Sequence, residues 1–74
     1  MRMYIELNSV KDALNFVDTV SRFDCDVDMI SGIHHIDAKS VLGVLGIGTN
    51  KKVMLDVHTE DTAIVQKDLQ KYIA

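Results

Sequence analysis

The first seven residues alternate strictly between apolar and polar or aromatic side chains. Met1, Met3, Ile5 and Leu7 occupy the odd positions, and the even positions carry Arg, Tyr and Glu. A repeat of two residues is typical of a half-buried β-strand. The pattern therefore predicts a first strand over Met1–Leu7.

A helical repeat replaces this alternation after Asn8. Apolar residues recur at spacings of three and four, as on one face of an amphipathic helix. They are Val10, Ala13, Leu14, Phe16, Val17 and Val20. Ser9, followed three residues later by Asp12, resembles a capping box in which Asp replaces the usual Glu. We predict a helix over Val10–Arg22 that begins at Ser9.

Two further alternating stretches follow the helix. The first predicts a strand over Cys25–Met29, and the second predicts a strand over Ile33–Ala38. Ser31 and Gly32 between them are a short turn signal, so the two strands are expected to form a hairpin.

The next segment, Val41–Gly46, is apolar nearly all round. Ser40 before it suits a helix N-cap, and Gly46 or Gly48 suits a helix end, so one or two helical turns are predicted. So short a helix cannot turn every apolar side chain inward, and Leu42 is the side chain expected to be exposed.

The clearest alternation in the chain predicts a fourth strand over Val53–Val57. A last helix is expected to begin near Glu60 and Asp61, whose carboxylates suit the positive end of the helix dipole. The predicted order is β-α-β-β-α-β-α in a single domain, residues 1–74. This is an α+β fold with one layer of helices on a sheet that has one buried face.

Composition and charge exclude several classes of function. The chain has 8 basic and 11 acidic residues and a net charge of −3, whereas a duplex-binding protein needs a basic face. A single cysteine excludes an internal disulfide and a thiolate-rich zinc site. The longest apolar run, Val41–Ile47, is far shorter than the roughly 20 residues that span a bilayer. We expect a cytoplasmic protein without a cofactor, a nucleic-acid partner or a membrane partner.

Two stretches of the sequence bring a known family into view. In Ile36–Leu45, Lys39 and Ser40 precede an aliphatic-Gly-aliphatic run, and Phe16–Phe23 matches the end of the family's first helix at the same spacing. Over about Ser9–Val57 the chain resembles HPr, the small phosphocarrier of the bacterial sugar phosphotransferase system. The resemblance implies an open-faced β-sandwich, with a four-stranded antiparallel sheet and three helices on one face.

The sequence departs from this family where the phosphate is carried. The family's acceptor histidine caps the first helix and is followed by Ala-Arg-Pro, but this chain has Ser9, Val10, Lys11 and Asp12. A serine phosphate ester is too stable to pass its phosphate on, Lys11 is a point charge in place of a bidentate guanidinium, and Asp12 repels phosphate. The chain is therefore more similar to the catabolite repression type of HPr, which also lacks the histidine. A non-catalytic protein that regulates carbon metabolism or sugar transport by protein binding is expected.

The resemblance implies that Ser40 is phosphorylated by an HPr kinase-like enzyme and that the modified protein binds a transcriptional or metabolic regulator. Lys39 would be the neighbouring positive charge, and Leu42 with Leu45 would form the docking surface. A phosphate at a helix start gains the dipole and free N–H groups. Ser40 can equally be a plain helix cap, and the two roles are compatible.

Two other hypotheses stay open. In one, the chain is a phosphocarrier whose acceptor is His34 or His35, although adjacent strand residues point to opposite faces and neither starts a helix. In the other, the chain has kept only the fold and binds a small ligand, or a metal through histidines that include His58. The sequence leaves monomer and homodimer equally open.

Overall fold

The computed structural model describes all 74 residues. It contains four strands and three α-helices, and the last helix continues into a 3-10 turn at Gln70–Tyr72. In chain order they are β1 (Arg2–Glu6), α1 (Val10–Ser21), β2 (Val27–Ser31), β3 (His34–Asp37), α2 (Val41–Ile47), β4 (Lys52–Val57) and α3 (Thr62–Leu69). The predicted order and the α+β class are confirmed.

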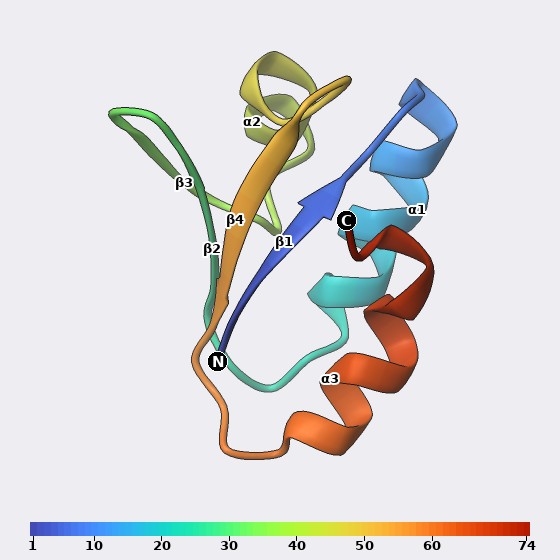
Figure 1. Cartoon of the computed structure of the whole chain (residues 1–74), viewed down its shortest axis with the longest axis vertical. Helices are drawn as coiled ribbons and strands as arrows, with labels where there is room; N and C mark the ends of the chain where they lie inside the picture. The colour runs from blue at the N-terminus through green and yellow to red at the C-terminus, as the bar shows by residue number, and fades with distance from the viewer.

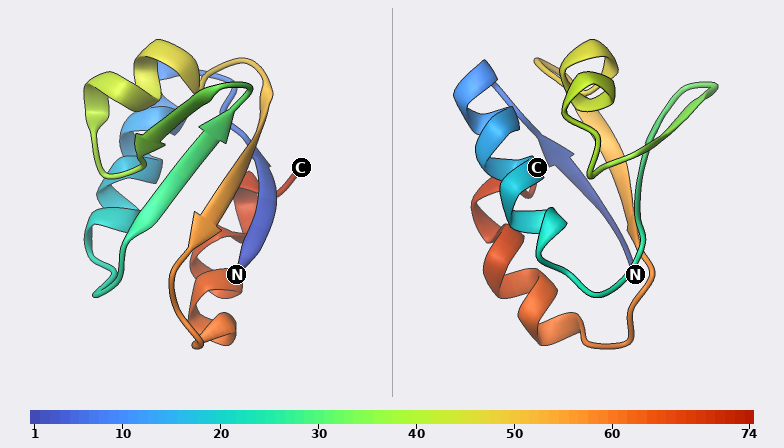
Figure 2. Two further views of the ribbon diagram at one scale, coloured as in Figure 1. Left: turned by 90° about the vertical axis from the view of Figure 1, so that its left-hand side faces the viewer. Right: turned by 180° about the vertical axis from the view of Figure 1, so that it is seen from behind.

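The four strands form one antiparallel sheet in the order β1-β4-β2-β3. All three helices lie against the same face of the sheet and leave the other face uncovered (Figure 1; Figure 2, left). Beyond β1, Ile73 makes a further antiparallel bridge with Ile5, and the Ala74 N–H donates to the Tyr4 carbonyl at 3.0 Å. The expected open-faced sandwich is therefore present, and the last residues of the chain extend it past β1.

The hairpin lies slightly later in the chain than predicted. Its two central residues are Gly32 and Ile33, and Ser31 pairs directly with His34. Gly32 has a φ of 59°, in the left-handed region that the first central position of a tight hairpin turn requires and that glycine reaches without steric cost. This requirement fixes the turn one residue later than the Ser31-Gly32 prediction and moves β2 to Val27–Ser31.

The core lies between the sheet and the helices, and the alternation of β1 and β4 points into it. It contains sixteen buried residues. They are Ile5, Leu7, Ala13, Phe16, Val17, Val20, Val27, Met29, Ala38, Val44, Val53, Leu55, Val57, Val65, Leu69 and Tyr72. Phe16 is completely buried at the centre of the inner face of α1, and its ring meets Tyr72 edge-on at 5.6 Å between centroids.

The apolar stripe of α1 is narrower than predicted. Val10 is 62% exposed and Leu14 is 46% exposed, although both fit the helical repeat. With Phe16 and Val20 directed at the sheet, a helix of twelve residues has no room to bury this second edge of its apolar face. Val10 and Leu14 were predicted to lie on the apolar face of the helix, but they are not part of the buried core.

Gly48, at the end of α2, is so closely surrounded that a side chain there should lower the stability of the protein. A Cβ at this position would lie 2.5 Å from Met29 Sδ and 2.9 Å from the Val44 carbonyl oxygen. Gly48→Ala should lower the unfolding free energy by about 1–3 kcal/mol, because one of these contacts must shift. Chemical denaturation of both proteins measures the change.

Gly46, two residues earlier, is the matched control because a Cβ there meets nothing within 4 Å. Gly46→Ala should raise stability by about 0.5–1 kcal/mol, since alanine loses less backbone entropy in a helix. Equal effects of the two substitutions would contradict the packing argument at Gly48.

Candidate functional site

The side chains of Ser9 and Asp12 cap the start of α1. Ser9 has an extended backbone, with φ −156° and ψ 165°, and its Oγ accepts a hydrogen bond from the Asp12 N–H at 3.0 Å. The Asp12 carboxylate in turn accepts from the Asn8 N–H at 3.4 Å. The predicted box is therefore present in a shifted form: the Ser9 cap is made, and the returning bond goes to the N–H of Asn8, one residue before the N-cap. It places a negative charge beside the start of the helix, which disfavours a second anion there.

The start of α1 carries a hydroxyl, an ammonium and a carboxylate in its side chains. Ser9 supplies a hydroxyl that already accepts a backbone hydrogen bond, and Lys11 makes no ion pair. The arrangement stabilises the helix, and its first turn contains no imidazole. Its chemistry is that of a cap.

The start of α2 has the same cap residue, and it too is exposed. The Oγ of Ser40 accepts from the Gly43 N–H at 3.3 Å, and the side chain is exposed. The Val44 N–H bonds to the Ser40 carbonyl, whereas the Val41 and Leu42 amides precede the first intrahelical bond. Unlike Ser9, Ser40 has no carboxylate as a capping partner three residues later. The cap at Ser40 therefore carries no negative charge three residues later.

The ammonium of Lys39 is directed elsewhere than the sequence analysis expected. Its Nζ donates to the Phe23 carbonyl at 2.9 Å, close to the end of α1. Its backbone N–H donates to Asp37 Oδ1 at 2.9 Å. A cation at the carbonyl end of a helix stabilises its dipole. In this structure Lys39 holds the end of α1 rather than extending beside Ser40.

Ser40 begins α2, whereas the chain just before Ser9 contacts the residues that follow the end of α2. Just after α2, Thr49 bridges to Leu7, and the Asn50 N–H donates to the Leu7 carbonyl at 2.6 Å, two residues before Ser9. Ser40 begins the same helix, whose seven residues span about 10 Å. Ser9 and Ser40 make no hydrogen bond to each other and have separate capping partners, Asp12 and Gly43.

Exposed apolar side chains accompany both helix starts. Leu42 is 83% exposed, as expected, and Val41 is 39% exposed. Val10 and Leu14 are exposed on α1, which packs against α2. Leu45, the other expected docking residue, is half-buried against the core. We call Val10, Leu14, Val41 and Leu42 the α1/α2 surface.

Sequence reasoning missed three of these four residues. The available signal was the surplus of apolar positions: α1 has two overlapping stripes, and α2 is apolar all round. Neither helix can bury so wide a face on a single sheet.

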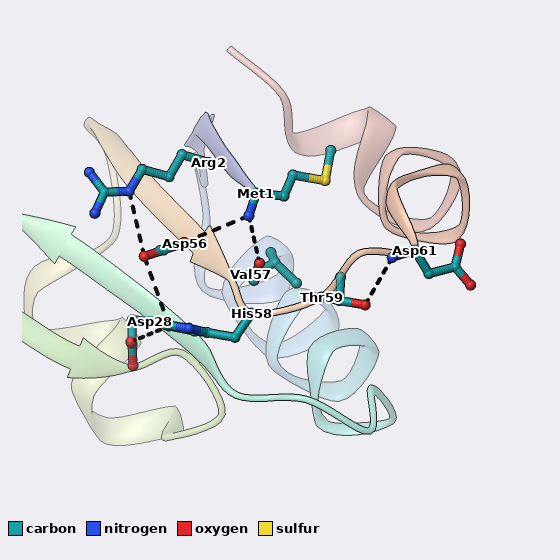
Figure 3. Close-up of polar contacts among 8 residues, drawn as sticks. All are labelled: Met1, Arg2, Asp28, Asp56, Val57, His58, Thr59 and Asp61. Carbon is teal, nitrogen blue, oxygen red and sulfur yellow. Dashed lines mark hydrogen bonds and ion pairs between the residues drawn. The ribbon is translucent and has the colours of Figure 1, made fainter.

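The three histidines lie on or beside the sheet. His34 and His35 are exposed at the start of β3, away from any helix start. His58 follows β4, and its Nε2 lies 2.9 Å from Asp28 Oδ2 and 3.8 Å from Asp56 Oδ2 (Figure 3).

Positive groups also surround Asp56. Arg2 Nε lies 3.5 Å from its Oδ2, and the amino group of Met1 lies 3.9 Å from its Oδ1 (Figure 3). This network joins β1, β2 and β4 on the uncovered face. No group of three or more histidine, cysteine or carboxylate side chains is arranged to hold a metal ion. None of the helices is long and apolar enough to cross a membrane.

Comparison with known proteins agrees with this architecture. Residues 10–74 match the family model described as the PTS HPr component phosphorylation site, so the match continues past Val57 through α3. No curated protein matches the chain.

Two solved structures share the fold. The structure titled HPr-C-His from Thermoanaerobacter tengcongensis has a TM-score of 0.77 and 24% identity, covering 99% of this chain and 90% of its own. A phosphocarrier protein HPr from Bacillus anthracis str. Ames has a TM-score of 0.74 and 20% identity, covering 100% of this chain and 96% of its own.

The capping box at the start of α1 can be tested by mutation. Ser9→Ala removes the acceptor of the Asp12 N–H and should lower the unfolding free energy by about 1 kcal/mol. Ser9→Asp, which keeps an acceptor, should retain most of the stability. Denaturation of the two variants under identical conditions measures both. Equal stability of Ser9→Ala and the parent chain would show that the Ser9 cap contributes little.

Proposed function

The chain belongs to the family of HPr components of the sugar phosphotransferase system, and we propose that it acts by binding other proteins rather than by carrying phosphate. The observation that carries this proposal is the capping box of Ser9 and Asp12. In the family, the acceptor histidine stands at this helix start. Here the position has a serine hydroxyl, and the Asp12 carboxylate, whose charge repels phosphate, bonds to the Asn8 N–H just before the helix.

Ser40 is the residue at which we propose regulation. Its hydroxyl is exposed, and a phosphate there would meet the positive end of α2 and the free amides of Val41 and Leu42. The modifying enzyme in this proposal is an HPr kinase-like protein. Lys39 adds a positive charge one residue away, once its ammonium leaves the Phe23 carbonyl.

The proposed docking area begins at Ser40 and follows the α1/α2 surface. Leu42 is its most exposed apolar side chain, while Leu45 supports it from a half-buried position. A partner that covers Leu42 removes apolar area from water, which is the main source of affinity at such a surface. The partner we propose is a transcriptional or metabolic regulator in the bacterial cytoplasm that controls carbon metabolism or sugar transport.

Intact-mass measurement tests the phosphorylation proposal. Incubation with ATP and an HPr kinase should add one phosphoryl group to the parent chain and none to Ser40→Ala. Incubation with enzyme I and phosphoenolpyruvate should add nothing, because no acceptor imidazole stands at a helix start. A phosphate acquired from enzyme I would overturn the proposal and direct attention to His34 and His35.

A variant with the family's motif supplies the positive control for enzyme I. Ser9→His combined with Val10→Ala, Lys11→Arg and Asp12→Pro places His-Ala-Arg-Pro at the start of α1. This variant should accept phosphate from enzyme I if the fold and the docking area are intact. If neither the kinase nor enzyme I modifies the parent chain, phosphorylation is not its means of regulation.

The docking area is tested with the same kinase as the partner. Leu42→Asp should lower kcat/KM for phosphorylation of Ser40 about tenfold, because it places a charge in the apolar contact. Ile33→Asp is the matched control, since Ile33 is 95% exposed at the β2–β3 turn, away from Ser40. Equal losses in the two variants would contradict a specific role for Leu42.

A further inference from the structure

A hollow lies where the end of α1 faces the start of α3. A cavity of about 280 Å³ opens there between Arg22–Cys25 on one side and Thr59, Asp61, Ile64 and Val65 on the other. A neighbouring hollow of about 510 Å³ shares Arg22, Phe23 and Ile64 with it. Because they share these residues, the two form one elongated, open groove. We call it the α1/α3 groove.

The floor of the groove is apolar. Val65 is buried in the core, and Phe23 and Cys25 are half-buried against the core. Ile64 stands at the junction of the two hollows and is 53% exposed. An isoleucine so exposed beside a hollow offers apolar area that a partner can cover.

The rim of the groove is acidic. Asp24 and Asp61 line the first hollow, and Asp68 lines the second. None of the three makes an ion pair, whereas the guanidinium of Arg22 is already paired with Asp18 at 3.6 Å. Asp68 lies beside Lys67 and Lys71, with which it lines a third hollow. The excess of negative charge therefore belongs to the first hollow, where Asp24 and Asp61 are unpaired and Arg22 is paired with Asp18.

We propose that the α1/α3 groove docks a segment of a partner protein that carries an apolar side chain flanked by lysine or arginine. The apolar side chain lies on Phe23 and Ile64, and the basic side chains pair with Asp24 and Asp61. The open, elongated shape favours a polypeptide over a small molecule, because small-molecule sites enclose most of the ligand's surface. Charge complementarity sets the choice of a basic segment.

This surface is distinct from the docking area proposed above. Ser40, Val41 and Leu42 line neither hollow of the groove. The inference therefore stands whether or not Ser40 is phosphorylated, and it gives the chain a second contact with its partners.

The test uses a blocked peptide of alternating leucine and lysine residues and the isotopically labelled full chain. Amide shifts in NMR titration should be largest at Arg22–Cys25 and Thr62–Val65. A peptide with glutamate in place of lysine should bind at least about tenfold more weakly. Asp24→Asn with Asp61→Asn should weaken binding about fivefold at low salt, and asparagine retains the capping acceptor at position 61.

Two matched controls separate the groove from general charge and general hydrophobicity. Glu6→Gln with Asp37→Asn changes the net charge equally but lies on the sheet, so it should leave the affinity unchanged. Ile64→Gln should weaken binding about tenfold, whereas Leu42→Gln should not. Shifts centred on α2, equal losses in the two charge variants, or equal binding of the glutamate peptide would each overturn the proposal.

Discussion

The packing of Phe16 against the sheet determines which residues this protein presents to its partners. The side chain is fully buried, and its ring meets that of Tyr72 edge-on, so α1 is held between the sheet and the 3-10 turn that follows α3. Such edge-to-face pairs add about 0.5–1.5 kcal/mol to the burial itself. Because this contact fixes the rotation of α1 about its axis, Val10 and Leu14 must face outward. The part of the α1/α2 surface that lies on α1 therefore follows from the packing of Phe16.

Two serines cap helices in the same way, but the side chains around them carry different charges. Both Ser9 and Ser40 cap a helix, and both accept from the amide three residues later. At α1 that third residue is Asp12, whose carboxylate closes the box; at α2 it is Gly43, which adds no charge. The cap of α1 therefore includes a carboxylate, and the cap of α2 does not. The helix dipole alone would favour an anion at both helix starts.

Local patterns predicted the elements well because the physics behind them is local. The alternation of β4 and the Ser9 cap of α1 depend on residues at most a few positions apart, and both are present as expected. The hairpin turn was predicted one residue early, because the positive φ belongs to the first central position, and composition alone does not fix which position Gly32 takes.

The features that the sequence did not predict depend on contacts between residues distant in the chain. The bond from Lys39 to the Phe23 carbonyl spans sixteen residues, and no local pattern announces it. The α1/α3 groove unites Arg22–Cys25 with Thr59–Val65, and its acidic rim is invisible until the fold joins them. Val10 is exposed because Phe16 on the same helix is buried against Tyr72, far away in the chain. Patterns give each helix its apolar faces, but only three-dimensional packing selects the face that is buried.

The bridge between Ile5 and Ile73 bears on how the molecule meets copies of itself. Unpaired edge strands invite other chains to add to a sheet, which leads to aggregation or strand exchange. With Ile73 and Ala74 hydrogen-bonded along the outer side of β1, that edge is occupied. The remaining edge, β3, has four residues and carries His34, His35 and Asp37, a short and polar strand of the kind that resists such addition. If two copies were to join their sheets edge to edge, β3 would be the strand that met its counterpart.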